Sequence, residues 1–520
     1  MAQSASMAIS PQTTAHGRRT GLVLFAMCLG VFIAQLDSSV VYLAVSNIGA
    51  DLNAGITEQQ WILDIYNLVY AALLLTGGTL ADIFGRARMF VAGVGLIAAG
   101  SIVCAVAPGT EILIAGRAVT GLGSALQIPA SLAILTVAYP DAHARGRAIG
   151  IWASCNGIAI AIGPTVGGIL VQTLGWRSIF YAALPICALA IVLAWARVPN
   201  SRDTAERKLD PIGQILAIIA LGSLAFVTIE GPHRGLASPV IIAPAVAMIV
   251  AALIFVRVER GQTTALVPFD MFASKAFNAA LALAGLMTFG MYAMLFLVPI
   301  YLQSFVGLSA TRAGLALVPL SLVFVALSQV SGPLMKRFGA RAMTAGGMGA
   351  MGAGLIVLVV AAGSGNMVAI ELALVIVGAG LGLNTGPVNA VAVANVTPGR
   401  SGTASGLVNT ARMVGATLGI AILGALYAVL ARSGTADGLI SGLRAALGAG
   451  ALAELSGVAI ALRYLTAHSA EQKPASSSQP PFAAEQHHLG ADDTGEHRTS
   501  GKQPDHEARG ERREAHRRGH

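Results

Sequence analysis

Stretches of mostly apolar residues alternate with short polar segments along almost the whole chain. A helix needs about 20 apolar residues to cross the hydrocarbon core of a bilayer, and each of these stretches reaches that length. The pattern predicts an all-α integral membrane protein with fourteen transmembrane helices. The predicted segments are residues 20–46, 58–78, 89–108, 111–137, 148–172, 178–197, 211–230, 238–257, 277–302, 311–334, 342–363, 367–391, 403–430 and 441–465.

Both ends of the chain lack this pattern. Residues 1–19 are polar, and residues 466–520 are rich in Ser, His, Arg, Glu and Gly. Because this tail has almost no large apolar side chains, it cannot bury a core, and we expect it to be disordered. Nothing holds its histidines, including His487 and His488, in fixed positions, so we expect no metal site and no cofactor.

The distribution of basic residues over the predicted loops indicates the orientation. With the N-terminus in the cytoplasm, fifteen Arg and Lys residues fall in inside loops and four in outside loops, namely Arg177, Arg234, Arg312 and Arg432. Cytoplasmic loops of membrane proteins carry an excess of such residues. We therefore expect a multi-pass membrane protein with both termini in the cytoplasm.

Composition excludes several classes of protein. The chain is 55% hydrophobic and 11% charged, whereas soluble domains carry about 25% charged residues. The net charge of +8 lies in loops and in the tail, so it does not indicate nucleic-acid binding. The four cysteines fall inside apolar stretches, which argues against a disulfide framework. No phosphate-binding loop is present, so we do not expect ATP as the energy source. We also do not expect an enzyme.

The chain also contains an internal repeat. The loop Gly78–Arg88 follows the second segment and resembles Gly332–Arg341 after the tenth, at an offset of 254 residues (332 − 78). Arg145 and Arg400 repeat at an offset of 255 (400 − 145). Two repeated halves with a site between them are common in transporters. We expect an N-terminal segment 1–19, a six-helix bundle 20–197, an inserted helix pair 198–276, a second six-helix bundle 277–465 and a cytoplasmic tail 466–520.

Five short motifs follow one another along the first half. The first segment has Leu36, Asp37, Val40, Val41 and Ala44, and the second opens with Trp61, Asp64 and Tyr66. The loop motif comprises Gly78, Leu80, Ala81, Asp82, Gly85, Arg86 and Arg88. The fourth segment has Leu113, Arg117, Gly121 and Gly123. The fifth has Gly150, Gly163, Pro164, Gly167 and Gly168.

In these residues the chain resembles the major facilitator superfamily, specifically its fourteen-helix drug:proton antiporter branch. That branch includes exporters of quaternary ammonium biocides, methylenomycin, puromycin and tetracenomycin. The sequence departs from the branch patterns at Ser39, Tyr42, Ile83, Ala87 and Ala159. The resemblance, over about residues 20–465, implies two six-helix bundles plus an inserted helix pair, proton-coupled drug export and a location in a bacterial inner membrane.

Three charged residues inside apolar segments are candidates for proton coupling. Asp37 lies deep in the first segment, where an ionised side chain is costly, and intramembrane carboxyl groups are functional candidates. Alternatively it is a static partner of a nearby cation. Asp64 lies near the outer end of the second segment, where it can share a vestibule with Asp37. The resemblance implies a role in binding a cationic substrate or a proton, and the alternative is a residue in the interface with water. A buried Arg117 must find an acceptor; the resemblance implies a proton relay, and a structural ion pair is the alternative.

Two other motifs have conformational roles by resemblance. Gly78, Asp82, Gly85, Arg86 and Arg88 are expected to form a conformational latch, in which Asp82 meets the amino end of helix eleven; the alternative is a solvated loop. Gly163, Pro164, Gly167 and Gly168 make a segment poor in side chains that another helix can approach closely. That segment either is a packing notch or takes part in exchange.

Further polar residues complete the set of candidates. Tyr66, Tyr70, Gln127, Asn384 and Asn389 either line a substrate cavity or pack in the interior. Glu454 in the last segment and Arg412 in the thirteenth are a possible ion pair, although terminal helices of this fold are usually peripheral.

The expected function is proton-driven export of a small amphipathic drug or antibiotic by alternating access. The expected partners are this small molecule, protons and membrane lipid, for a monomeric protein that binds no nucleic acid. Two alternatives stay open: an exporter of an endogenous metabolite or siderophore, and a non-transporting membrane receptor with the same fold.

Overall fold

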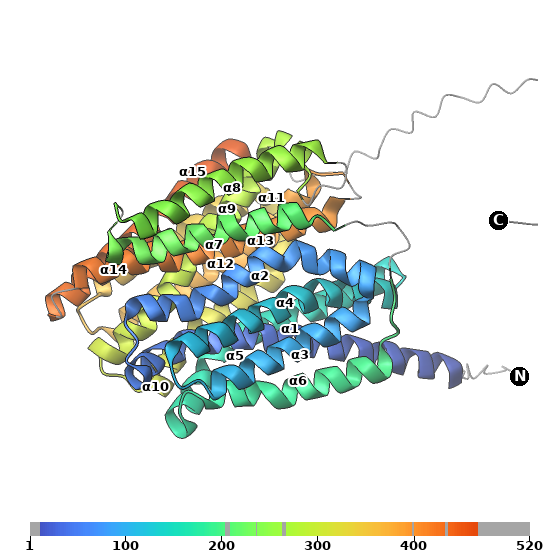
Figure 1. Cartoon of the computed structure of the whole chain (residues 1–520), viewed down its shortest axis with the longest axis horizontal. Coiled ribbons are helices and arrows are strands. Elements are labelled where there is room, and N and C mark those ends of the chain that lie inside the picture. The colour runs from blue at the N-terminus through green and yellow to red at the C-terminus, as the bar shows by residue number, and fades with distance from the viewer. Residues whose placement is uncertain are drawn as a thin grey trace, which may run out of the picture. The chain divides into compact units, whose positions relative to one another are not determined.

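Long helices running roughly side by side make up the described part of the chain (Figure 1). The computed structural model describes residues 11–202, 209–235, 237–262, 267–397, 400–431 and 435–465, and no strand occurs within these ranges. Residues 1–10 of the predicted N-terminal segment and the predicted tail, 466–520, lie outside the described residues.

The helices follow the predicted segments closely. Those of the first half are α1 (Pro11–Leu52), α2 (Ile56–Phe84), α3 (Arg86–Ala105), α4 (Thr110–Ala138), α5 (Ala142–Leu174) and α6 (Ser178–Arg197). Next come α7 (Pro211–Arg234) and α8 (Pro239–Gly261). The remainder are α9 (Lys275–Ile300), α10 (Ala310–Ala316), α11 (Val318–Ala361), α12 (Met367–Ala394), α13 (Ser401–Leu418), α14 (Gly424–Ala431) and α15 (Ala436–Tyr464), with π-helical turns at Tyr301–Phe305 and Gly419–Leu423.

The start of the first helix and the number of membrane-crossing helices differ from the prediction. Helix α1 begins at Pro11 rather than near Thr20, so polar residues continue the first helix beyond its apolar part. Among the described residues, thirteen helices rather than fourteen are long and apolar enough to cross a membrane. The difference lies in Ala310–Ala361, which counts as one span of 52 residues because two helices meet end to end at Gly339 without a longer linker.

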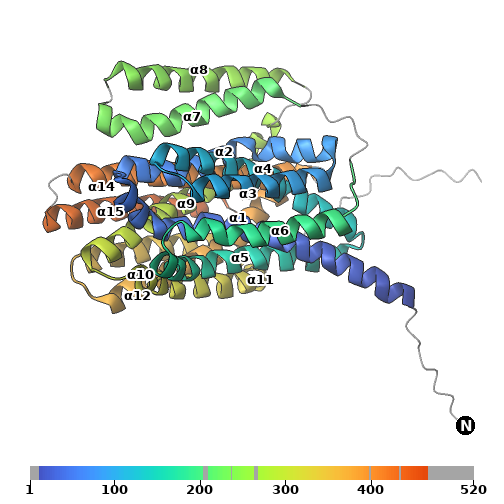
Figure 2. The same ribbon diagram turned by 60° about the horizontal axis from the view of Figure 1, so that its bottom comes forward.

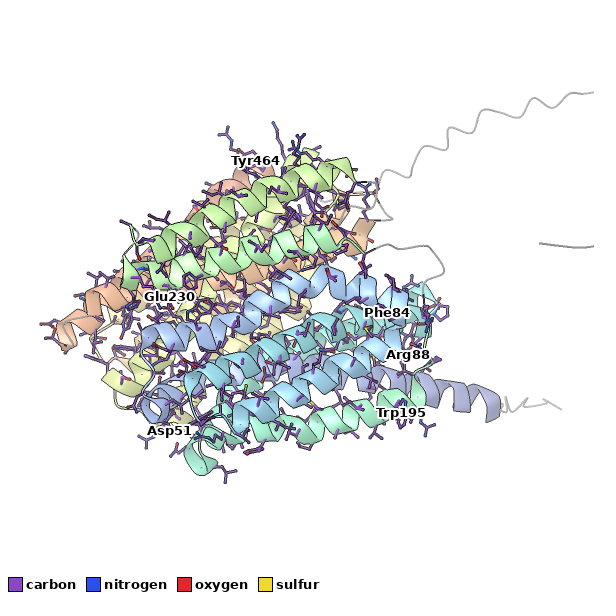
Figure 3. The ribbon with its side chains drawn as sticks, viewed as in Figure 1. Asp51, Phe84, Arg88, Trp195, Glu230 and Tyr464 are labelled. Carbon is purple, nitrogen blue, oxygen red and sulfur yellow. The ribbon has the colours of Figure 1, made fainter. Side chains whose placement is uncertain are left out.

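The bundle has two recognisable ends. Asp51 and Glu230 lie at one end, and Phe84 and Arg88 lie at the opposite end, as Figure 3 shows. We call these the Asp51 end and the Arg88 end. The Asp51 end carries the connections α1–α2, α3–α4 and α5–α6, and the Arg88 end carries α2–α3 and α4–α5.

The internal repeat extends to the packing of equivalent glycines. Gly85 and Gly339, which are 254 residues apart, both have positive φ, at 108° and 79°, a conformation that favours glycine. A Cβ at Gly121 in α4 would collide with the carbonyl oxygen of Tyr66, and one at Gly378 in α12 with that of Leu320. The two repeats therefore bring their helices together at corresponding positions, where a side chain has no room.

The helices pack more extensively within each half than between the halves. All of them belong to one compact unit. Helix α4 packs against α2 and α3, and α12 packs in the same way against the two parts of α11 before and after Gly339. The first half meets the second mainly where α2 runs along α13 and where α5 packs against α10 and α11.

Helices α7 and α8 form a hairpin at the side of the bundle, next to α2 (Figure 2). The Trp61 indole N–H donates to the Glu230 carboxylate at 3.0 Å, and the Gln214 amide donates to the Ala72 carbonyl at 2.8 Å. These bonds place α7 on α2. The family motif residue Trp61 thus serves the docking of the inserted pair.

Candidate functional site

An ion pair lies inside the first half, between α1 and α4. The Arg117 guanidinium donates to the Asp37 carboxylate, and both side chains are almost completely buried, with 1% and 3% of their surface exposed. A buried charge is tolerated only when it is paired. The structure thus brings together two of the three residues expected to couple protons.

Arg117 holds three helices together. Its Nε donates to the Ile62 carbonyl of α2 at 3.2 Å, and its guanidinium lies 4.6 Å from the centre of the Tyr66 ring. The Tyr66 hydroxyl in turn lies 3.0 Å from the Ala34 carbonyl of α1 and 2.9 Å from the Ser124 hydroxyl of α4. A guanidinium with one carboxylate, one carbonyl and one ring face is well compensated at this depth.

Asp64 is fully buried on α2, and neither of its carboxyl oxygens has a hydrogen-bond partner within the described chain. The alternative that it sits in the interface and sees water is therefore wrong. The reason is tertiary: Gln60 and Trp61, one turn earlier, bind the Gly419–Leu423 turn and α7, which cover this end of α2. An ionised carboxylate without a partner is very costly in such a place.

Tyrosines from both halves gather beside these charges. The Tyr66 and Tyr70 rings of α2 stack at 6.3 Å, and the Tyr42 ring of α1 meets the Tyr292 ring of α9 edge-on at 5.7 Å. The Asn67 amide donates to the Tyr42 hydroxyl at 3.2 Å. Tyr42, which departs from the family pattern, therefore takes part in a contact between the halves that sequence comparison alone would not indicate.

The three amides expected in a cavity do not gather with the tyrosines. Gln127 is fully buried in the first half and donates to the Gly30 carbonyl at 3.0 Å. Asn384 occupies the repeat-equivalent place in the second half. In the amide orientation that satisfies both groups, it donates to the Thr344 carbonyl and accepts from the Met348 N–H. Both amides join helices of one half, whereas Asn389 is half-buried on α12.

Glu454 and Arg412 do not form an ion pair in the structure. Glu454 is fully buried on α15, where its carboxylate lies against Gly290 of α9 and neither oxygen has a partner in the described chain. Arg412 of α13 points instead towards α12, where it donates to the Thr385 carbonyl at 3.1 Å. The expected pairing fails because α15 packs Glu454 against α9 whereas Arg412 of α13 reaches α12.

The glycines of α5 face two helices at once. A Cβ at Gly163 would overlap the Ser39 hydroxyl of α1, and one at Gly168 would lie 2.7 Å from the Ala310 carbonyl of α10. The Thr311 hydroxyl donates to the Gly168 carbonyl at 3.1 Å. Gly167 approaches α1 in the same way, at 3.2 Å from Val40. This part of α5 is therefore a close contact between the two halves.

Two other motif residues behave differently from each other. Pro164 is buried, and its carbonyl lies where a Cβ at Gly314 of α10 would be, so it belongs to the same contact. A Cβ at Gly150 would meet nothing within 4 Å. The close approach thus concerns only the part of the motif towards the Asp51 end.

Two glutamines that the sequence did not single out also join the halves at this end. The Gln60 amide of α2 donates to the Ile420 and Ala421 carbonyls at 2.7 and 3.1 Å, inside the π-helical turn. The Gln303 amide donates to the Leu43 carbonyl of α1 at 3.2 Å. A π-turn leaves backbone carbonyls without their usual helical partners, so a side-chain donor can bind them. Together with α5 and α10, these bonds close the Asp51 end.

The loop motif forms a tight turn at the Arg88 end. Asp82 and Arg86 make an ion pair one helical turn apart, at 2.9 Å, and Gly85 allows the sharp change of direction. The backbone N–H of Arg86 donates to the Ser201 carbonyl at 2.9 Å, which connects the turn to the segment after α6. Arg88 is exposed. A Cβ added at Gly78 would make an ordinary van der Waals contact with Pro129.

The expected neighbour of this turn was the amino end of helix eleven. The predicted helix eleven, residues 342–363, corresponds to the part of α11 after Gly339. Helix α2, which leads into this turn, runs antiparallel along α13, where a Cβ at Gly406 would lie only 2.6 Å from the Leu75 side chain. Within the described residues, no group of three or more His, Cys, Asp or Glu side chains gathers as metal ligands would.

Known proteins are similar to this chain in sequence and in fold. The family model of the Major Facilitator Superfamily matches residues 27–420. The Multidrug resistance protein Stp of Mycobacterium tuberculosis (strain CDC 1551 / Oshkosh) is 35% identical over 408 residues, covering 78% of this chain and 76% of that protein. The Methylenomycin A resistance protein of Streptomyces coelicolor is 32% identical over 417 residues, covering 79% of this chain and 87% of that protein.

Solved structures support the fold. A peptide transporter POT in complex with sulfate superposes with a TM-score of 0.64 at 19% sequence identity, over 85% of this chain and 94% of that one. The D-xylose-proton symporter gives 0.62 at 14% identity, over 86% and 98%. The repeated halves, the five motifs and these similarities agree, and the chain belongs to the major facilitator superfamily, within its drug-efflux branch.

Proposed function

We propose that this protein is a transporter and not an enzyme, and that it exports a small amphipathic drug or antibiotic in exchange for protons by alternating access. The observation that carries the proposal is Asp64. It is a fully buried carboxyl without a hydrogen-bond partner in the described chain. The other deep carboxylate of the first half, Asp37, is already paired with Arg117. A group in this position can take up and release a proton as its surroundings alternate between closed and open.

The proposed topology has fourteen crossings. The span Ala310–Ala361 would be about 78 Å long as one helix, which exceeds twice the 30 Å hydrocarbon core, so two crossings joined at Gly339 fit it better. We assign residues 20–197 and 277–465 to the two bundles and 198–276 to the inserted pair. The bias of basic residues supports cytoplasmic termini, an inner-membrane location, and the Asp51 end as the outer face.

The roles of the two aspartates differ in this mechanism. Arg117 compensates Asp37, so this pair holds α1, α2 and α4 in place and keeps its charges in the state described here. Asp64 holds the proton. When the Asp51 end opens, the bonds of Gln60 to the π-turn break and water reaches Asp64, which then exchanges its proton with the outside.

The contact of α5 with α10 serves as the outer seal. Closure brings the backbones of the halves together at Gly168 and Gly314, so it depends on the missing side chains there. At the opposite end, the turn Gly78–Arg88 is the proposed latch, with the amino end of α13 as its partner in the second half. Alternate formation of these two contacts would open one face at a time.

The proton gradient supplies enough energy for such export. One proton crossing 100 mV releases about 2.3 kcal/mol, and each pH unit adds about 1.36 kcal/mol. Their sum supports a substrate gradient of about 500-fold for a neutral molecule. Substrate export thus needs no nucleotide.

Two experiments test the proposal. Expression in a host that lacks its own efflux pumps should raise resistance to members of a panel of antibiotics and dyes. In inverted membrane vesicles with an acidic lumen, an exported compound should dissipate the pH gradient, and Asp64→Asn should abolish this effect. Substrate uptake that persists after an ionophore has collapsed the gradient would contradict the proton-coupled mechanism.

A further inference from the structure

Arg412 is an arginine at membrane depth in the second half, and it belongs to none of the five motifs. It lies 11 residues after the start of α13 at Ser401, which is about 16 Å along the helix and thus near the middle of a bilayer. Its side chain is only partly covered, unlike Arg117, which is 1% exposed. Within this half-buried side chain, the Nε atom is buried and has no hydrogen-bond partner in the described chain.

The charge of Arg412 has no counter-ion in the described chain. Its Nη2 donates to the Thr385 carbonyl at 3.1 Å, its Nε has no partner, and no described carboxylate pairs with it. Two other arginines of the bundle have more partners: Arg117 has Asp37 and the Ile62 carbonyl, and Arg444 has the Val359 and Ala362 carbonyls. A buried guanidinium with one neutral acceptor is incompletely compensated, and an anion beside it is strongly favoured.

Two tyrosines flank this guanidinium, one from each half. Tyr70 lies on α2, which runs along α13, and Tyr292 lies one turn after Thr288 of α9, whose hydroxyl donates to the Arg412 carbonyl at 2.6 Å. Neither tyrosine hydroxyl makes a hydrogen bond within the described chain. Tyr70 stacks on Tyr66, and Tyr292 meets Tyr42. Aromatic faces accept the apolar ring of a ligand, while free hydroxyls and a guanidinium fork accept its oxygens.

We propose that Arg412, Tyr70 and Tyr292 form a subsite for a carboxylate group of the exported molecule. The inference deepens the proposed export function and rests on it: the substrate is an amphipathic organic acid rather than a quaternary ammonium compound. The planar guanidinium binds a carboxylate through two parallel hydrogen bonds, and the apolar remainder of the substrate lies against the tyrosine rings. A permanently cationic substrate would meet an uncompensated positive charge at the same place and is disfavoured.

The position of the subsite suits alternating access. Tyr70 belongs to the first half, whereas Arg412 and Tyr292 belong to the second, so movement of the halves separates the groups that hold the substrate. The carboxylate-free surroundings of Arg412 ensure that the ligand, rather than the protein, supplies the anion.

Three fluorescent probes that share one ring system can test this subsite. They are 7-diethylaminocoumarin-3-carboxylic acid, its neutral carboxamide and its trimethylammonioethyl amide. Binding of each to the purified full-length chain in detergent is measured by fluorescence anisotropy. The variants are Arg412→Gln, Arg412→Lys and the control Arg444→Gln, which removes an arginine of the same half that lies outside the subsite.

We expect the wild-type protein to bind the acid more tightly than the amide and the ammonium probe. Because hydrogen bonds to charged groups contribute roughly 1.5–3 kcal/mol, Arg412→Gln should weaken acid binding by about 10- to 100-fold and amide binding by less than about 3-fold. Arg412→Lys, which keeps the charge but loses the fork, should fall between. Arg444→Gln should leave all three affinities unchanged.

Two results would overturn the inference. If Arg412→Gln weakens the acid and the amide equally, the guanidinium serves the conformational cycle and not the ligand. If the ammonium probe binds best to the wild type, the subsite does not select anions. Export of cationic compounds from cells would in either case leave the proposed efflux function standing, whereas absence of any proton-coupled export would refute that function independently.

Discussion

Two aspartates that look alike in sequence should respond in opposite ways to the same substitution. Asp37→Asn leaves the Arg117 guanidinium buried without its counter-ion, and breaking a buried pair costs about 3–5 kcal/mol of unfolding free energy. We expect the lower end of this range because Arg117 keeps the Ile62 carbonyl and the Tyr66 ring face. Asp64→Asn replaces an unpartnered carboxyl by a group of similar size, so its effect should be within about 1 kcal/mol of zero.

The two substitutions should also differ in their effects on abundance and proton coupling. Asp64→Asn should retain wild-type abundance but lose proton coupling, because the amide cannot carry the exchanged proton. Asp37→Asn should fold poorly, and adding Arg117→Gln to it should recover most of the lost stability, because a neutral pair leaves no isolated charge. The sequence alone would have predicted that Asp37→Asn keeps the fold.

The assay combines two measurements on each variant. Thermal unfolding in detergent, followed by size-exclusion of a fluorescent fusion, gives relative stability, and substrate-induced dissipation of the pH gradient in inverted vesicles gives coupling. The order expected for stability is wild type and Asp64→Asn together, then the double variant, then Asp37→Asn. Coupled transport by a well-folded Asp64→Asn protein would refute the assignment of the proton to Asp64, and equal stability of the two single variants would refute the energetic argument.

Three further predictions concern the contacts between the halves and the tail. Gly168→Leu should insert normally but lose export, because its side chain would enter α10 and prevent closure, whereas Gly150→Leu, where a Cβ meets nothing within 4 Å, should transport normally; loss of activity in both would point to a general effect on α5. Gln60→Leu should raise labelling of a cysteine introduced near the Asp51 end by a membrane-impermeant thiol reagent, since the bonds to the π-turn are lost, and unchanged labelling would show that they do not hold this end closed. A chain ending at Ala470 should transport at the wild-type rate per molecule, as measured by drug efflux at equal abundance, and a clear decrease would assign the tail a role that its composition does not indicate.

Helix positions and the two-fold repeat followed from the sequence, because both depend on local physics. A bilayer imposes a length of about 20 apolar residues on every crossing, so membrane segments can be recognised from hydropathy alone. The glycines at 85 and 339 were placed by the repeated loop, and both indeed adopt positive φ. The first-half ion pair was also within reach, since a deep Asp37 and a deep Arg117 each require compensation and few other charges are available.

Partners between distant helices were beyond the sequence. Asp64 sits near the start of an apolar segment, and only the covering α7 and π-turn make it a fully buried group. Gln127 and Asn384 carry polar groups at membrane depth, yet their hydrogen bonds stay inside one half, so they join helices and do not face a cavity. Glu454 and Arg412 contact different helices, α9 and α12, which hydropathy does not encode. Local patterns determine where a membrane-crossing helix lies along the chain. The neighbour that compensates a buried charge, or leaves it without a partner, depends on how the helices rotate and pack, and only the tertiary structure decides that.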